Sequence, residues 1–268
     1  MTTTSGRKGR FPFRLGTTSY IVPADILPNV ELLAPLVDDV ELVLFESEEQ
    51  SNLPDPGTIG RLAALGRERG LSYTLHLPLD ARLGDADEAV RRRSVAKCLA
   101  VIARLRPLAP LASAVHLDWD GRGGLPADPD GWRARLSRSV GELVAAGVRP
   151  RDLCVENLGF PFDSVEPVVL EHDLAVCMDV GHLLLMGLSP EEFLDRHLER
   201  CRIVHLHGVV DGRDHRGLAG LEPGMLARMV ERLSGRGAAD RIVSLEVFSR
   251  ADLDESLAIM EGLAQWAG

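Results

Sequence analysis

The feature that most constrains the fold is an alternation of short apolar runs with longer segments of helical periodicity. Eight runs rich in Val, Ile and Leu begin at Phe13, Val40, Ser72, Ser113, Asp152, Leu174, Arg202 and Arg241. Residues 85–106 and 132–146 have helical periodicity, and Ser189 followed by Pro190 and two acids is a strong helix start. Eight strand–helix units predict an α/β fold in which a parallel sheet closes into a (β/α)8 TIM barrel. An open, doubly wound sheet is the alternative.

The length of 268 residues suits one such domain, predicted over residues 11–268 after a disordered tail of residues 1–10. The stretch after the first run, "GTTSYIVP", lacks the GxGxxG spacing of a dinucleotide-binding fold. Two Gly- and Pro-rich segments, residues 118–131 and 209–224, are expected to be long loops at the mouth of the barrel.

Net charge and apolar patterning indicate which partners and which cellular compartment to expect. The 30 basic and 40 acidic residues give a net charge of −10, which argues weakly against a nucleic-acid partner. No run is long enough to span a membrane, and the N-terminal stretch lacks an export signal, so we expect a cytoplasmic protein. No protein partner can be inferred.

The cysteines carry no metal-binding or disulfide spacing. None of the four forms a CxxC pair, and each lies in an apolar segment. We therefore expect buried free thiols in a reducing compartment at Cys98, Cys154, Cys177 and Cys201.

Polar side chains gather where the predicted strands end. In a TIM barrel these ends converge on one mouth, where catalysis takes place. The residues at these ends, or in the loop after the seventh strand, are His76, His116, Glu156, Asp179, His182, His205, His207, Asp214, His215 and Glu246.

Taken singly, these residues have ordinary explanations. A histidine on a buried strand is more often a hydrogen-bonded core residue, and Asp179 with His182 could form a local turn-capping pair. Taken together, several carboxylates and imidazoles cannot share one mouth without severe desolvation unless cations compensate. The sequence therefore predicts a metal site.

The number of ions follows from the number of ligands. One divalent ion would be satisfied by Glu156, Asp179, His205 and Glu246, which leaves the other histidines surplus. Two or three ions with bridging carboxylates use them all, and zinc suits this mixture, although manganese and iron also fit. Closely spaced ions suit phosphoryl chemistry.

Other residues are weaker candidates. His207 could be a ligand, a supporting hydrogen-bond donor or a substrate contact, and Asn157 is expected to orient its neighbours. Tyr20, Phe160 and Phe162 could line a pocket, although loop aromatics are more often simply packed. Loop arginines that could hold a phosphate are Arg122, Arg213 and Arg216. We expect His172 and His197, both in helical segments, at the surface.

These residues carry a family resemblance. The motifs "HLP" at His76, "HLD" at His116, "VEN" at Glu156, "DVGH" at Asp179, "HLHG" at His205, "DH" at Asp214 and "LEV" at Glu246 resemble the xylose-isomerase-like barrel superfamily. Within it they are similar to the apurinic endonuclease branch, which implies a trinuclear zinc cluster. The resemblance implies that nine residues are metal ligands: His76, His116, Glu156, Asp179, His182, His205, Asp214, His215 and Glu246. One departure is that Asp214 and His215 are adjacent, whereas that branch separates them by one residue.

A narrower resemblance comes from "FRLGTTSYIVPADILPNV", "VDDVELVLFE" and "LHLPLD". These stretches resemble the bacterial cobamide-remodelling phosphodiesterases. The resemblance implies a corrinoid substrate, an adenosylated cobamide, cleaved at its phosphoribosyl bond to give cobinamide phosphate and an α-riboside. We predict Glu156, Glu246 and His205 as catalytic residues and Tyr20, His207, Arg213 and Arg216 as substrate contacts.

Three other functions remain open. A sugar isomerase or epimerase would keep one metal and use Glu156 and Glu246 as paired acid–base carboxylates. A DNA-repair enzyme would need a basic groove, which nothing in the sequence marks. A non-catalytic corrinoid- or metal-binding protein would bind metal without turnover.

Overall fold

Eight parallel strands form a closed barrel in the computed structural model, which describes residues 8–47, 50–118 and 126–264. The order around the barrel is β1-β10-β7-β6-β5-β4-β3-β2, so the first and last barrel strands are neighbours. The barrel strands are β1 (Arg14–Thr18), β2 (Asp39–Val43), β3 (Ser72–His76), β4 (Ser113–Val115), β5 (Leu153–Glu156), β6 (Ala175–Asp179), β7 (Cys201–Leu206) and β10 (Ile242–Leu245). The predicted TIM barrel, and each of its eight apolar runs, is confirmed.

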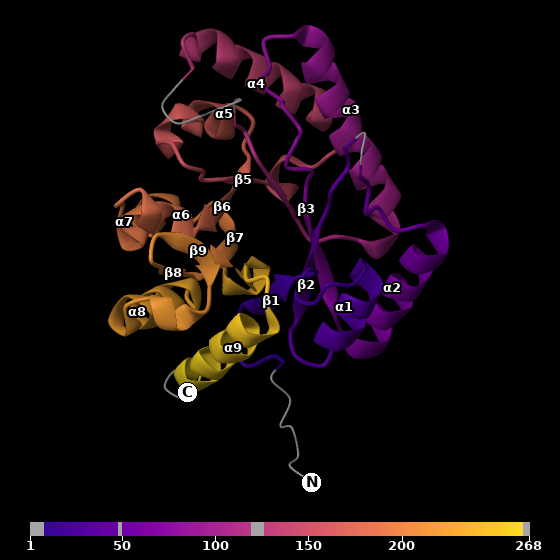
Figure 1. The fold of residues 1–268 in the computed structure, drawn as a ribbon. Helices are drawn as coiled ribbons and strands as arrows, with labels where there is room; N and C mark the ends of the chain where they lie inside the picture. Colours follow the sequence, from indigo (N-terminus) through magenta and orange to yellow (C-terminus); the bar gives the residue numbers. More distant parts are fainter. Residues whose placement is uncertain (1–7, 48–49, 119–125, 265–268) are drawn as a thin grey trace.

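Helices surround the barrel, as the view in Figure 1 shows. They are α1 (Ile26–Leu33), α2 (Pro56–Arg69), α3 (Glu88–Leu105), α4 (Pro129–Ala145), α5 (Glu166–Glu171), α6 (Val180–Leu185), α7 (Pro190–His197), α8 (Pro223–Leu233) and α9 (Arg250–Ala264). The predicted start of α7 is confirmed, because the Ser189 side chain accepts a hydrogen bond from the backbone N–H of Glu192. None of the described helices is both long and apolar enough to cross a membrane.

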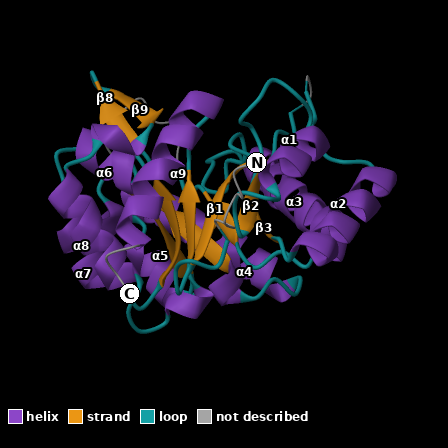
Figure 2. Cartoon of the chain, turned by 90° about the horizontal axis from the view of Figure 1, so that it is seen from below, coloured by secondary structure: helices purple, strands orange, loops and turns teal. Residues whose placement is uncertain are grey.

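The segment of residues 209–224 is more ordered than expected. It contains strands β8 (Gly208–Val210) and β9 (Arg213–Arg216), which pair with each other in an antiparallel hairpin separate from the barrel sheet. Figure 2 shows this hairpin at one end of the barrel strands, close to α6. The prediction of a long loop is therefore wrong here, and Asp214 and His215 are held on a strand.

The cysteines and the N-terminal residues were also predicted from the sequence. All four cysteines are free and buried, as predicted. Residues 1–7 of the expected tail and Arg122 lie outside the described residues. Lys8, placed in that tail, donates to the carbonyl of Arg69 at 2.7 Å.

The surface prediction for His197 is wrong. Its side chain is 5% exposed, and its ring lies 4.4 Å from that of Phe193 and 5.1 Å from that of Phe162. The imidazole is thus part of an aromatic cluster beneath α7, which explains its burial. The same packing buries Phe162, and Phe160 packs edge-on against Trp132. The two phenylalanines are therefore packed side chains.

Candidate metal centre

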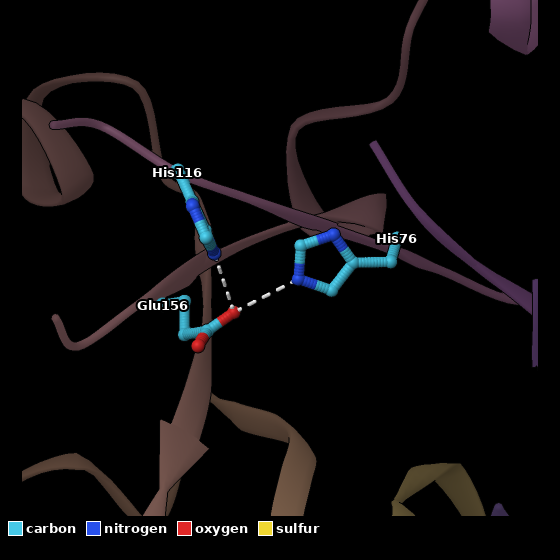
Figure 3. Close-up of side chains that lie close together, drawn as sticks. All are labelled: His76, His116 and Glu156. Carbon is cyan, nitrogen blue, oxygen red and sulfur yellow. Dashed lines mark hydrogen bonds and ion pairs between the residues drawn. The ribbon is translucent and has the colours of Figure 1, made fainter. Parts of the chain in front are cut away.

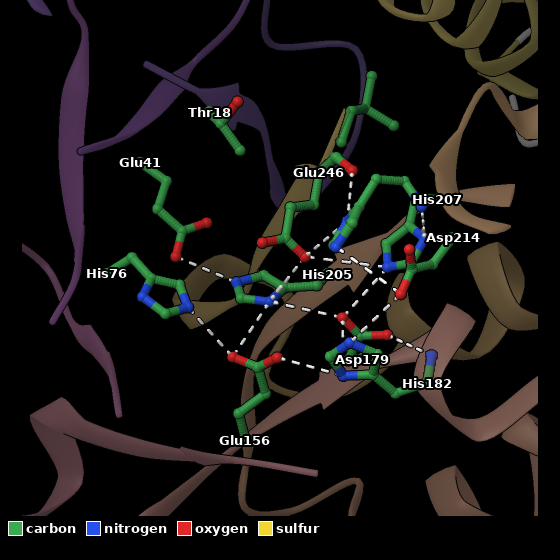
Figure 4. Close-up of polar contacts among 12 residues, drawn as sticks. Thr18, Glu41, His76, Glu156, Asp179, His182, His205, His207, Asp214 and Glu246 are labelled. Carbon is green, nitrogen blue, oxygen red and sulfur yellow. Dashed lines mark hydrogen bonds and ion pairs between the residues drawn. The ribbon is translucent and has the colours of Figure 1, made fainter. Parts of the chain in front are cut away.

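The carboxyl ends of the barrel strands bring the predicted ligands into one cluster. Because parallel strands end at the same mouth, residues far apart in sequence become neighbours there. Figure 4 shows most of the cluster, with side chains from β2, β3, β5, β6, β7, the β8–β9 hairpin and the end of β10 directed toward a common centre. All nine predicted ligands lie in it, and groups of three or more come close enough to share one ion.

The first group consists of His76, His116 and Glu156. Figure 3 shows both imidazoles directed at the same carboxylate oxygen. Glu156 Oε2 lies 3.3 Å from His76 Nε2 and 3.1 Å from His116 Nε2. His76 Nδ1 lies 3.0 Å from the carbonyl oxygen of Leu77, which requires a proton on Nδ1 and leaves Nε2 free as a ligand.

The second group surrounds His205, which is fully buried at the end of β7. Its Nδ1 lies 3.2 Å from Glu246 Oε2 and 3.5 Å from Glu156 Oε2. Asp179 Oδ2 is 3.9 Å from the same nitrogen. Glu156 is therefore shared between the first and second groups, as a bridging carboxylate would be.

The third group consists of His182, Asp214 and His215. Asp214 Oδ2 lies 3.8 Å from His182 Nε2 and 3.9 Å from His215 Nε2. The side chains are about one-quarter to one-third exposed, so this group is the most accessible of the three. Asp214 and His215 are adjacent in sequence, yet Asp214 still faces His182. The β8–β9 hairpin packs against α6, the helix that carries His182. His215 itself has a left-handed backbone with φ of 53°.

The "DVGH" motif has two roles at once. Asp179 ends β6 and also caps α6, since its Oδ1 accepts from the backbone N–H of His182 at 2.6 Å. The remaining oxygen, Oδ2, faces the cluster. Gly181 is required for a steric reason, because a Cβ at this position would overlap the ring of His207.

His207 supports the ligands. Its Nδ1 accepts from the backbone N–H of His215 at 2.9 Å, so Nε2 carries the proton and donates to Asp179 Oδ2 at 3.1 Å. Both ring nitrogens thus have protein partners, and the side chain is fully buried. Of the three roles considered for this residue, the geometry favours the supporting one.

Asn157 also orients Asp179. Its side-chain oxygen accepts from the Asp179 N–H at 2.7 Å, and its amide donates to the Asp179 carbonyl at 2.9 Å. These two bonds fix the point at which β6 turns into α6. The orienting role expected for Asn157 agrees with this geometry.

The buried acids of the cluster have pKa values that are shifted in opposite directions. Burial alone would raise the pKa of Glu156. The nearby His116 and His205 have the larger, opposite effect, so the pKa of Glu156 lies well below its usual range. Burial raises the pKa of Glu246 well above its usual range. His205 lowers this pKa, but the negative charges of Glu156 and Asp179 raise it again, so the net shift remains upward. The protein by itself therefore does not compensate all of this negative charge.

A divalent metal cluster fits the residues present. Among the described residues, the cluster contains three buried polar atoms without a hydrogen-bond partner: Glu41 Oε2, His205 Nδ1 and Glu246 Oε2. Two of these, on His205 and Glu246, face each other. An uncompensated buried donor or acceptor is costly, and a cation between these two atoms would satisfy both.

Glu41 belongs to the cluster and was missed by sequence reasoning. This residue of β2 is fully buried, and its Oε1 lies 3.0 Å from His205 Nε2. The available signal was an acid in the middle of the apolar run "VELVLFE", a position where an unpaired carboxylate is rare.

The predicted substrate contacts are more dispersed. Arg213 and Arg216 are exposed on β9, beside Asp214 and His215. Tyr20 follows β1, is 45% exposed and lines a cavity at the mouth.

Comparisons with known proteins agree with the architecture. The family model described as xylose isomerase-like TIM barrel matches residues 37–266. A D-tagatose 3-epimerase-like protein superposes with a TM-score of 0.76 at 19% identity, covering 95% of this chain and 98% of the other. Endonuclease IV from Thermus thermophilus gives 0.66 at 22% identity, covering 94% and 98%. An L-ribulose 3-epimerase gives 0.69 at 20% identity, covering 95% of each chain. No curated protein matches the sequence.

Proposed function

Because the chain belongs to the xylose isomerase-like TIM barrel family, we propose that it is a metal-dependent phosphodiesterase that hydrolyses the nucleotide loop of cobamides. The observation that carries the proposal is the third ligand group, His182 with Asp214 and His215, beside the two groups that share Glu156. A one-metal enzyme has no use for this additional group. Three adjacent ions suit an anionic phosphodiester, whose charge they would neutralise.

The residues that would hold the ions are the nine of the three groups. When bound, the ions supply positive charge to the phosphodiester and acidify water, so that hydroxide is accessible at neutral pH. Zinc suits this mixture of imidazole and carboxylate ligands, and manganese and iron tolerate it.

The protein's own contribution is positioning. His207 and Asn157 hold Asp179, and Glu41 holds His205. Water attacks phosphorus, the bond from phosphorus to the ribosyl oxygen breaks, and that oxygen takes up a proton. The products are cobinamide phosphate and an α-riboside. Arg213 and Arg216, which are exposed on β9, would contact the phosphate or its substituents.

The competing function is that of a one-metal sugar epimerase. It is favoured by the second group alone, since Glu156, Asp179 and Glu246 surround His205 Nδ1 as a complete set for one ion. Glu156 and Glu246 would then act as acid and base. Metal stoichiometry and substrate separate the two functions.

The test is elemental analysis of the purified protein, followed by anaerobic incubation with adenosylated cobamide and mass analysis of the products. Two or three ions per chain together with cobinamide phosphate support the proposal. One ion per chain, no corrinoid cleavage and interconversion of a ketose would overturn it in favour of the epimerase. In the Asp179→Ala and Glu246→Ala variants, both bound metal and turnover should be lost, whereas Asp130→Ala, on the exposed surface of α4, should retain both.

A further inference from the structure

A preformed cavity lies at the carboxyl end of β1 and β2, the end of the barrel that carries the metal centre. It has a volume of about 800 Å³ and lies between the loop after β1 and the loop after β2. This volume is within the usual range for small-molecule sites. Nothing in the proposed metal chemistry requires this cavity, so its lining indicates what else binds here.

Both walls of the cavity are held by buried or half-buried asparagines. Asn29 accepts from the backbone N–H groups of Ile21 and Val22, both at 2.9 Å, and its amide donates to the carbonyl of Ala24. On the opposite side, Asn52 accepts from the N–H of Phe45 at 2.7 Å and donates to the carbonyl of Val43 at 2.8 Å. These hydrogen bonds hold the described residues on both sides of the cavity, so ligand binding would cost little conformational entropy there.

The lining combines aromatic and apolar side chains with polar ones, and none of the described lining residues is basic. Tyr20 and Phe45 lie edge to face with ring centroids 6.0 Å apart, and Leu27 and Leu53 add apolar surface. Tyr20 leaves 45% of its surface exposed. An exposed aromatic ring in a cavity is a stacking surface for a planar heterocycle.

The charged residues of the lining are acids. Asp55 is occupied in capping α2, where it accepts from the N–H of Thr58. Asp25 precedes α1 without a side-chain capping bond, so its carboxylate is available to accept from a hydroxyl. This lining disfavours a phosphate and favours a neutral ligand that carries hydroxyl groups.

Tyr20, which lines the cavity, lies two residues after Thr18 at the end of β1, on the same side of the barrel as the metal centre. Tyr20 follows β1 and Phe248 follows β10, and the Thr18 hydroxyl donates to the carbonyl of Val247 at 3.0 Å between them. Figure 4 shows Thr18 at the edge of the cluster. The ring of Phe248 packs on that of His215, with centroids 4.9 Å apart, and is 42% exposed.

We propose that this cavity binds the riboside half of the substrate, with its planar aromatic base on Tyr20 and its ribose hydroxyls toward Asp25. The proposal rests on the proposed function, since it assigns the leaving half of the same phosphodiester. The shape of the cavity then selects which base the enzyme accepts, and the wider corrin ring lies across the open mouth.

The test is calorimetric binding of two probes to the metal-loaded protein: the α-riboside of 5,6-dimethylbenzimidazole, and cobinamide, which lacks the riboside. Tyr20→Ala, at an exposed position, should raise the Kd of the riboside about tenfold, as expected for loss of base stacking, and the Kd of cobinamide much less. Tyr20→Phe keeps the ring and should retain most of the affinity. Leu170→Ala, half-exposed on α5, is the matched control and should bind both probes like the wild type.

Cobamide cleavage measured in parallel separates the two proposals. If the wild type cleaves cobamide but Tyr20→Ala binds the riboside normally, the function stands and the cavity assignment is overturned. If Tyr20→Ala weakens cobinamide instead, the cavity holds the corrin and the assignment is again overturned. If the wild type neither cleaves cobamide nor binds the riboside, the proposed function itself fails.

Discussion

Glu41 Oε1 lies 3.0 Å from Nε2 of His205, and both side chains are fully buried. The bond requires a proton on Nε2, which leaves Nδ1 directed at Glu156, Asp179 and Glu246 with a lone pair free for a metal. Carboxylates commonly fix the tautomer of a ligating histidine in this way and make it a stronger ligand. Burial alone would raise the pKa of Glu41. The interaction with His205 has the larger, opposite effect, so the pKa of Glu41 lies below its usual range.

Glu41→Gln should therefore weaken metal binding without removing a ligand. The amide retains an acceptor oxygen but loses the charge, and we expect an affinity about 10–100-fold lower, measured by chelator competition. Glu31→Gln, in an exposed ion pair with Arg61, is the matched control. Unchanged metal affinity in Glu41→Gln would show that the carboxylate does not tune His205.

Gly181→Ala should impair the site through His207. The added Cβ overlaps the His207 ring, so the ring must move and lose its bond to Asp179. Turnover is expected to fall about 10–100-fold, the usual effect of losing a residue that supports a metal ligand. Gly60→Ala in α2 meets no neighbour, so it should keep full activity and gain up to about 1 kcal/mol of stability. Wild-type rates in Gly181→Ala would contradict the role given to His207.

Asp214→Ala should remove one ion and leave the others. Asp214 contacts His182 and His215 but none of the residues of the first group. Elemental analysis should show metal content lower by about one ion per chain, with unchanged far-ultraviolet circular dichroism. Metal content equal to that of the wild type would remove Asp214 from the ligand set.

Asp39 should make stability depend on pH. Burial raises the pKa of this β2 carboxyl to about 6, against the bonds that it accepts from Ser72 and Thr74. A folded-state pKa above the unfolded value means that the contribution to stability is fully present below about pH 4 and is lost as the pH rises through about 6. The shift of about two units corresponds to about 3 kcal/mol.

Urea unfolding of the metal-free protein from pH 4 to pH 8 tests this point. The unfolding free energy of the wild type relative to that of Asp39→Asn should fall by about 3 kcal/mol over this range. A constant difference between the two proteins would show that Asp39 has an ordinary pKa.

The barrel and the cluster of imidazoles and carboxylates at its mouth were predictable because both depend on local patterns. Each apolar run marks a strand, and a polar residue at its end marks the mouth. The β8–β9 hairpin was not predictable, since its strands are only three and four residues long and β9 reads as polar throughout. Glu41 was missed because its partner, His205, is 164 residues away. His197 was misassigned because helical periodicity alone does not reveal an aromatic neighbour.

In the part of the chain that the structure describes, the hairpin that carries Asp214 and His215 shares no strand pairing with the barrel. It packs against α6, and the backbone N–H of His215 donates to His207 Nδ1. Because it lies outside the barrel sheet, we expect its local stability to be lower than that of the core. Such a unit can open, or change in length over evolution, while the eight-stranded core stays folded. If the proposed third ion is bound, its ligands Asp214 and His215 depend on an accessory of fewer than ten residues, so we expect a change there to alter the number of ions without rebuilding the barrel.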